Sequence, residues 1–181
     1  MIKEMKHVVV DLETMGIVPG CAIVSLGAVV FDPRFDSVSD KKFYVELDWE
    51  AQTEDGFTVD ENTKEWWNNQ DSVAREALNG MEELEETLID FARWLPSDVK
   101  IWGNGATFDV SILEYCYRKF NIEIPWKFWN IRDVRTIKDL YESSRGGFSK
   151  AMEGTKHNAL DDAVYEAEMV CKMWKSILGG N

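Results

Sequence analysis

Acidic side chains recur in three short segments of this sequence, at spacings that could gather carboxylates around a divalent cation. In the first segment, Asp11 and Glu13 follow the apolar, β-branched run Val8 to Val10. Residues two apart in a strand project from the same face, so both carboxylates would lie together at the end of a buried strand. Adjacent carboxylates repel each other and are costly to desolvate, and a divalent cation removes that cost. A polar strand end explains a lone Asp-x-Glu equally well.

The second segment runs from Gly103 to Asp109 and contains the small residues Gly105 and Ala106. A strand that ends at Gly103 would be followed by a turn that delivers Asp109 to the first turn of a helix. Glycine and other small residues permit the close approach of a ligand or of a second backbone. An aspartate at a helix N-terminus also stabilises the helix, so this position alone has a structural explanation.

The third segment places His157 just before a predicted helix and Asp162 on that helix, five residues later. Asp161 and Asp162 point about 100° apart on a helix, so they are expected to have different roles. The structural alternatives are a charge effect at the helix N-terminus and a surface histidine. The other histidine, His7, precedes the first strand and is predicted to be structural.

Three strands are predicted before residue 50, and their spacing indicates how they pair. Val8–Leu12, Ala22–Phe31 and Phe43–Leu47 are apolar or alternating runs joined by short links, which predicts an antiparallel meander. Six helices are predicted after residue 60: from Asn62 or Thr63 through Trp66 and Trp67, from Ser72 to Gly80, and over Met81–Leu95, Phe108–Phe120, Asp133–Tyr141 and Asn158–Leu178. The last of them is expected to end before Gly179 and Gly180. Two further strands are predicted at Lys100–Asn104 and Phe128–Ile131, and a loop at Ser143–Gly147. The whole chain, residues 1–181, is therefore expected to form one α/β domain with a mixed central sheet flanked by helices.

Charge is distributed unevenly along the 181 residues, whose formal net charge is −13. Residues 46–99 hold 16 acidic against 3 basic side chains, whereas residues 100–156 hold 7 acidic against 10 basic ones. The net charge argues against a nucleic-acid partner, but the second segment could hold a phosphate backbone locally. No apolar run is long enough to span a membrane, and Met1 to Lys6 lack the apolar region of a signal peptide, so the cytoplasm is expected.

Taken together, the order and setting of these segments resemble the DEDDh branch of the DnaQ-like 3′–5′ exonucleases, whose fold is ribonuclease H-like. Asp11 to Thr14 resemble the first motif of that family, Asn104 to Asp109 the second, and His157-x-Ala159-x-x-Asp162 the third. Asp11 to Gly16 and the pair Trp66 and Trp67 are most similar to ribonuclease T-like exoribonucleases and to related phage exodeoxyribonucleases. The resemblance extends from Val8 to about Val170.

The resemblance implies a metal-dependent exonuclease that releases nucleoside 5′-monophosphates from single-stranded 3′ ends. Asp11, Glu13, Asp109 and Asp162 would hold two Mg²⁺ or Mn²⁺ ions, which suit oxygen ligands, and His157 would take the proton of the attacking water. Candidate contacts to the terminal nucleotide are Thr14, Met15, Trp66, Trp67 and Phe108. Neighbouring helix residues point about 100° apart, so at most one of the two tryptophans should stack on a base. A homodimer is also compatible with the resemblance.

Three alternatives share parts of this pattern. A ribonuclease H-type endonuclease or resolvase has a similar acidic cluster, but the five-residue spacing of His157 and Asp162 favours the exonuclease. A non-catalytic nucleic-acid-binding module would have lost carboxylates, whereas all five expected positions are filled. DNA and RNA both stay open as substrates, because no residue can be identified as a contact to the 2′-hydroxyl.

Overall fold

Five strands form one mixed sheet in the order β3-β2-β1-β4-β5 in this computed structural model, which describes residues 5–35 and 38–179. β1 (His7–Thr14), β2 (Ile23–Phe31) and β3 (Val38–Glu46) are antiparallel neighbours. β4 (Lys100–Gly103) runs parallel to β1, and β5 (Ile131–Asp133) runs parallel to β4. The mixed sheet with an antiparallel first half is therefore as predicted.

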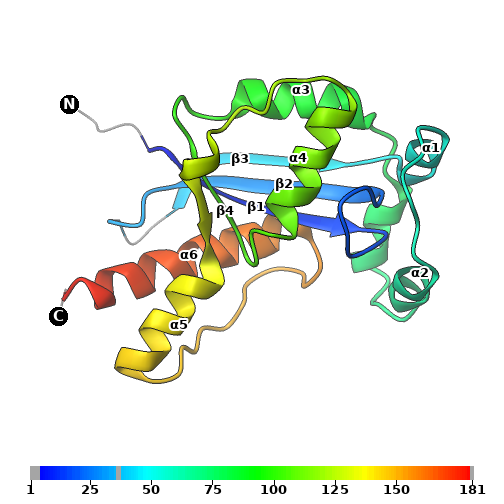
Figure 1. The fold of residues 1–181 in the computed structure, drawn as a ribbon. Coiled ribbons are helices and arrows are strands. Elements are labelled where there is room, and N and C mark those ends of the chain that lie inside the picture. The colour runs from blue at the N-terminus through cyan, green and yellow to red at the C-terminus, as the bar shows by residue number, and fades with distance from the viewer. Residues whose placement is uncertain (1–4, 36–37, 180–181) are drawn as a thin grey trace.

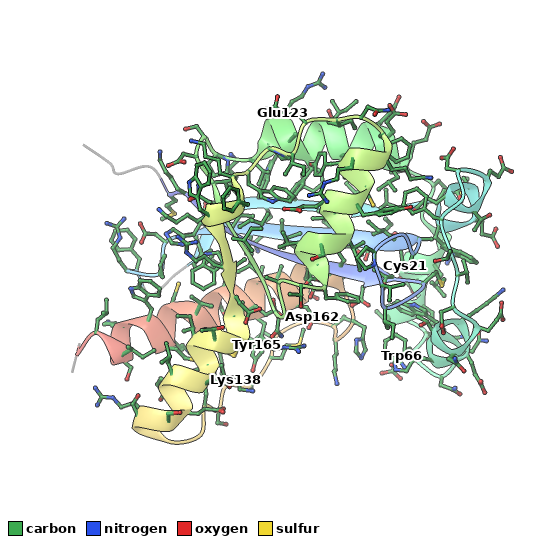
Figure 2. All side chains as sticks on the ribbon, in the orientation of Figure 1. Cys21, Trp66, Glu123, Lys138, Asp162 and Tyr165 are labelled. Atoms are coloured by element: carbon green, nitrogen blue, oxygen red, sulfur yellow. The ribbon has the colours of Figure 1, made fainter. Side chains whose placement is uncertain are left out.

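The two faces of the sheet are covered by different helices (Figure 1). α3 (Leu84–Trp94) and α4 (Asp109–Lys119) cover one face, where they share a core with Val8 and Val10 of β1. α6 (Ala159–Ile177) and α5 (Val134–Arg145) cover the other face, where Val9 contributes to the core. Side chains fill the space between sheet and helices on both faces (Figure 2). Because side chains alternate along β1, Asp11 and Glu13 share the face of Val9 and α6.

The first turn of α6 lies directly against β2 at Gly27. A Cβ atom on Gly27 would stand 2.1 Å from the carbonyl carbon of Ala159, so only glycine fits at this position. Gly27 is also the register partner of Asp11 in β1. The missing side chain therefore brings the start of α6 close to the carboxylates of β1.

Two short helices follow β3, and the first was not predicted. α1 (Trp49–Glu54) buries Gln52, whose amide accepts a hydrogen bond from the Ile23 N–H and donates one to the Ile23 carbonyl, both at 2.8 Å. α2 (Glu61–Asn68) carries the tryptophan pair as expected. Its N-cap is Asp60 rather than Asn62 or Thr63, because the Asp60 carboxylate accepts the Thr63 N–H at 2.9 Å.

Several predicted boundaries were wrong. The predicted helix from Ser72 to Gly80 is a 3₁₀ helix over Ala74–Asn79, and the helix expected over Met81–Leu95 begins at Leu84 because Glu82 pairs with Leu47 as a β-bridge. Phe128–Asn130 form a 3₁₀ helix, so the strand predicted over Phe128–Ile131 begins only at Ile131. α5 continues through most of the predicted loop, to Arg145, and ends at Gly146 with φ +89°.

The last helix agrees with its prediction, and Asn158 is its N-cap. Gly180, which was predicted to follow the end of this helix, lies outside the described residues. So do residues 1–4, which belong to the N-terminal segment predicted to lack the apolar region of a signal peptide. Within the described chain, no helix has the length and apolarity needed to cross a membrane. Cys21, Cys116 and Cys171 are buried, and none of the three forms a disulfide.

Candidate active site

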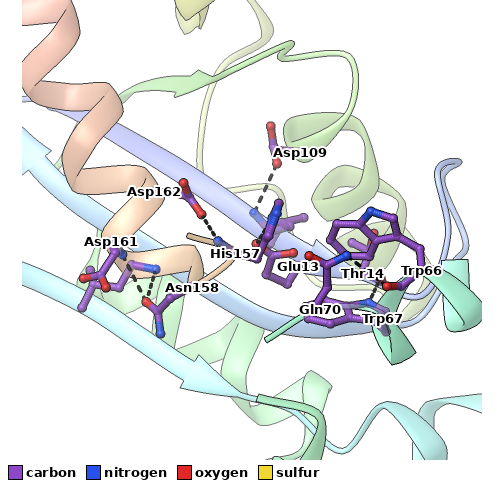
Figure 3. A network of polar contacts seen from close by, with 12 residues as sticks. Glu13, Thr14, Trp66, Trp67, Gln70, Asp109, His157, Asn158, Asp161 and Asp162 are labelled. Carbon is purple, nitrogen blue, oxygen red and sulfur yellow. Dashed lines mark hydrogen bonds and ion pairs between the residues drawn. The ribbon is translucent and has the colours of Figure 1, made fainter. Parts of the chain in front are cut away.

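The three acidic segments meet at the carboxyl end of β1. β1 and β4 are parallel neighbours, so their carboxyl ends open at the same edge of the sheet. Glu13 lies near the end of β1, Asp109 begins α4 after the turn that follows β4, and Asp162 lies on the first turn of α6. Figure 3 shows these side chains and His157 facing a common space from different elements.

Glu13, His157 and Asp162 form the tightest group in this space. One ligand atom from each of the three lies within 4.8 Å of the others. His157 Nδ1 is 4.0 Å from Glu13 Oε1, and the His157 backbone N–H donates to Asp162 Oδ2 at 2.9 Å. The histidine has a φ of +64°, a left-handed conformation that is uncommon outside glycine. This backbone turn directs the imidazole toward the carboxylates before the helix begins.

The N-terminus of α6 is anchored on β3. Asn158 Oδ1 accepts the N–H groups of Leu160 and Asp161 at 3.1 Å, and its Nδ2 donates to the Tyr44 hydroxyl at 3.0 Å. Asp161 turns away from Asp162 and accepts the Thr155 N–H at 2.8 Å. The two adjacent aspartates thus have different partners, as their angular separation on the helix predicted.

Asp109 and Asp11 lie beside this group. Asp109 is 3% exposed, and its Oδ1 accepts the Leu12 backbone N–H at 3.2 Å, which ties the start of α4 to β1. Asp11 is partly buried, and its charged neighbours include Asp109, Glu13 and Asp162. The structure therefore brings all five predicted active-site residues to one place.

Burial and mutual repulsion disfavour the ionised forms of these carboxyl groups. Burial, with repulsion from the surrounding acids, raises the pKa of Asp11 well above its ordinary value and that of Glu13 to about 8. Burial raises the pKa of Asp109 to about 7, although its hydrogen bond from Leu12 opposes the shift. The pKa of Asp162 is raised by burial as well. Burial, assisted by the charge of Lys156, lowers the pKa of His157, so this imidazole favours its neutral form.

One further acid in this region was missed by the sequence reasoning. Glu166 of α6 is 5% exposed, and its Oε1 accepts a hydrogen bond from Asn104 Nδ2 at 2.8 Å. Its Oε2 has no hydrogen-bond partner among the described residues. Glu166 lies four residues after Asp162, which places both on one side of the helix, and this spacing was the available sequence signal.

These residues fit a hard divalent cation. The donors are carboxylate oxygens and one imidazole, and none of the three cysteines belongs to the group. Oxygen ligands of this kind suit Mg²⁺ or Mn²⁺ rather than a thiolate-selected metal. The buried, unpartnered Glu166 Oε2 and the repelling carboxylates are groups whose burial a cation would stabilise.

A cleft of about 480 Å³ opens next to Glu13, and its walls include Thr14, Trp66 and Phe108. Trp66 is 40% exposed, and its ring centroid lies 4.8 Å from that of His157 at an interplanar angle of 84°. Trp67 is buried in the core instead, and its Nε1–H donates to the Thr14 carbonyl at 3.0 Å. Only one tryptophan therefore reaches the cleft.

Among the predicted nucleotide contacts, Met15 is not placed as expected. Met15, predicted to lie against a terminal nucleotide, is 1% exposed and packs in the core below the cleft. Alternation along the chain explains this, because Thr14 faces the cleft and its successor faces inward. His7 lies at the far end of β1 and accepts a hydrogen bond from Trp102 Nε1 at 3.0 Å, which fits the structural role predicted for it.

The sequence of the chain is similar to known nuclease sequences. Residues 6–174 match the family model described as the 3′–5′ exoribonuclease Rv2179c-like domain. The chain is 28% identical over 157 residues to an exodeoxyribonuclease of Enterobacteria phage T4, and the match covers 71% of this chain and 68% of the phage protein.

Solved structures of nucleases share the fold. Cell-death related nuclease 4 superimposes with a TM-score of 0.69 at 13% identity over 95% of this chain, and the chain spans only 64% of that protein's length. The nuclease domain of 3′hExo, a DEDDh family member solved with bound rAMP, superimposes with a TM-score of 0.61 at 11% identity, over 97% of this chain and 94% of that domain. At such identities these likenesses establish a shared ribonuclease H-like exonuclease fold.

Proposed function

Since the chain belongs to the Rv2179c-like 3′–5′ exoribonuclease domain family, we propose that it removes nucleoside 5′-monophosphates from single-stranded 3′ ends. The observation that carries the proposal is the meeting of Glu13, His157 and Asp162 within 4.8 Å, beside a cleft with an exposed tryptophan. We further propose that residues 1–181 act as one exonuclease domain.

Asp11, Glu13, Asp109 and Asp162 would hold two Mg²⁺ or Mn²⁺ ions. When bound, such ions lower the pKa of water and neutralise charge that develops on the phosphate and on the departing 3′-oxygen. The four carboxylates come from β1, α4 and α6, so the binding site depends on the docking of both helices onto the sheet. Their raised pKa values reflect the unfavourable free energy of the ionised carboxylates in the metal-free protein, and bound ions would offset it.

His157 would accept the proton of the attacking water. The bond between the water oxygen and phosphorus would form as the P–O3′ bond breaks, and the departing 3′-oxygen would take a proton from solvent. The products would be a nucleoside 5′-monophosphate and a shortened chain with a free 3′-hydroxyl. A general base must be neutral at working pH, and the lowered pKa of His157 favours that form. The ring of Trp66 packs against the imidazole and would restrict its orientation.

The terminal nucleotide would occupy the cleft between Thr14, Trp66 and Phe108. Base stacking on an aromatic side chain contributes about 1–3 kcal/mol and tolerates any base. The family description names ribonucleic acid, whereas the phage relative is named for deoxyribonucleic acid, so the sugar preference is a question for experiment. Sedimentation velocity would test the homodimer that the resemblance suggested.

An end-labelled degradation assay tests the proposal. Matched single- and double-stranded DNA and RNA, with free or blocked 3′ ends, are incubated with the protein and Mn²⁺ or Mg²⁺. Stepwise shortening from free 3′ ends is expected, and the protein with Asp109→Asn serves as the control for contaminating nucleases. Internal cleavage of blocked substrates would overturn the proposal in favour of a ribonuclease H-type endonuclease.

A further inference from the structure

Glu166 is a buried carboxylate that the proposed function leaves without a role. It lies one helical turn beyond Asp162 on α6 and is 5% exposed. Asn104, in the turn after β4, donates to Glu166 Oε1 at 2.8 Å. The other oxygen, Oε2, is fully buried and has no hydrogen-bond partner in the described part of the chain. One oxygen of this carboxylate is therefore held by a hydrogen bond, and the other has none among the described residues.

The charged surroundings of Glu166 are mostly acidic. It is repelled by Asp109 and Asp162, and it is the carboxylate that repels Asp11 most strongly. Arg135 is a cation that opposes this repulsion, and its exposed guanidinium donates from Nε to Asn104 Oδ1 at 3.3 Å. Arg135 thus supports Asn104 and makes no described hydrogen bond with Glu166 itself.

A buried carboxylate with a free oxygen is costly unless a partner satisfies it. Here Glu166 and three carboxylates proposed as metal ligands, Asp11, Asp109 and Asp162, repel one another, and each of the three adds to the cost. A cation at the site would stabilise these carboxylates, because it attracts Glu166 and the other three acids.

We propose that Glu166 is a fifth carboxylate of the metal site, which binds the cation held by Asp11, directly or through one of its waters, with Oε2. Asn104 fixes the opposite oxygen and so orients the carboxylate. This inference rests on the proposed metal-dependent function. Residues that support metal ligands in this way typically contribute about 10- to 100-fold to metal affinity.

Calorimetric titration of the metal-free protein with Mn²⁺ tests the inference without reference to activity. Glu166→Gln keeps the size of the side chain and an oxygen that can accept the Asn104 hydrogen bond, but removes the charge. We expect its Mn²⁺ affinity to fall about 10- to 100-fold. The matched control is Glu168→Gln, which makes the same change on the same helix at a residue paired with Lys150, and its affinity should equal that of the wild type.

Thermal unfolding of the metal-free variants supplies a second measurement. Glu166→Gln cannot carry a charge in the repelling cluster, so its midpoint should rise relative to the wild type at alkaline pH, where the wild-type carboxyl is ionised, while added Mn²⁺ should raise it less than in the wild type. Glu166→Asp keeps the charge but shortens the reach by one methylene, and its Mn²⁺ affinity should be intermediate.

The outcomes separate the two proposals. A wild-type protein that does not bind Mn²⁺ would refute the proposed function itself. Wild-type binding with unchanged affinity in Glu166→Gln, or in Glu166→Asp if the glutamine variant does not fold, would overturn only the role of Glu166. It would then be a protonated acid that orients Asn104.

Discussion

Replacing the Glu13 carboxylate by an amide should stabilise the metal-free protein at alkaline pH but not at acid pH. Burial, with repulsion from Asp162 and Asp109, raises the pKa of Glu13 from 4.5 to about 8. Below the unfolded-state pKa the carboxyl is protonated in both states and contributes no difference. As pH rises, the unfolded chain loses this proton first, so the wild type becomes less stable until pH passes the folded-state value.

The size of the effect follows from the shift. One pKa unit corresponds to about 1.4 kcal/mol, so the rise at Glu13 sets a ceiling of about 5 kcal/mol. Glu13 is 8% exposed, so solvent screening reduces this figure only modestly. A typical domain has a total stability of about 5–15 kcal/mol, and the loss should therefore be readily measurable.

Urea unfolding followed by tryptophan fluorescence, in EDTA at pH 5, 7 and 9, measures this directly. Glu13→Gln should have a flatter dependence of stability on pH than the wild type, whereas Glu85→Gln on the exposed side of α3 should follow the wild type. Saturating Mn²⁺ should reduce the advantage of Glu13→Gln, since the intact site gains more binding free energy, about 2.7 kcal/mol at 100 times Kd. Parallel pH dependences for wild type and Glu13→Gln in EDTA would refute the reasoning.

Other substitutions separate the remaining roles. Asp109→Asn should reduce exonuclease activity by more than about 100-fold with an unchanged circular dichroism spectrum, and retained activity would contradict its role. His157→Ala should lower kcat by about 100-fold or more with little change in Mn²⁺ affinity measured by calorimetry. Because the pKa of His157 is lowered, kcat should fall with acidity only below about pH 6.5, and Lys156→Gln should move that limb upward. Trp66→Ala should raise KM for an oligonucleotide by an amount equivalent to about 1–3 kcal/mol, whereas Trp67→Ala should instead cost about 3–5 kcal/mol of stability in urea.

Sequence periodicity was sufficient for the elements whose burial repeats regularly. The runs before residue 50 predicted the antiparallel strands, and the spacing of Asp11 and Glu13 correctly predicted a shared face. The boundaries failed where local hydrogen bonds compete with periodicity, as at Asp60, which caps α2 two or three residues earlier than the sequence suggested. The strand predicted to begin at Phe128 was wrong for a different reason, because the apolar Phe128 side chain is 77% exposed and does not belong to a buried strand.

Parts of the site depend on contacts between segments distant in the chain, which no local pattern reveals. Asn104 and Glu166 are 62 residues apart, and only the folded chain brings them together. Gly27 was visible as a glycine inside a strand, but the approach of Ala159 to it could not be read from the sequence. Met15 is buried in the core whereas Trp66 lines the cleft, and this difference likewise depends on which side of the cleft wall each residue faces.

The contact between α6 and Gly27 has a consequence for biosynthesis. All five strands are synthesised before residue 159, yet His157, Asp162 and Glu166 arrive only with α6. A nascent chain that has folded its sheet would therefore hold Asp11, Glu13 and Asp109 without His157, Asp162 and Glu166, and could not yet hydrolyse nucleic acid. Since docking of α6 requires residue 27 to lack a side chain, the same glycine would permit the last step that completes the site of a nuclease emerging among ribosomal and messenger RNA.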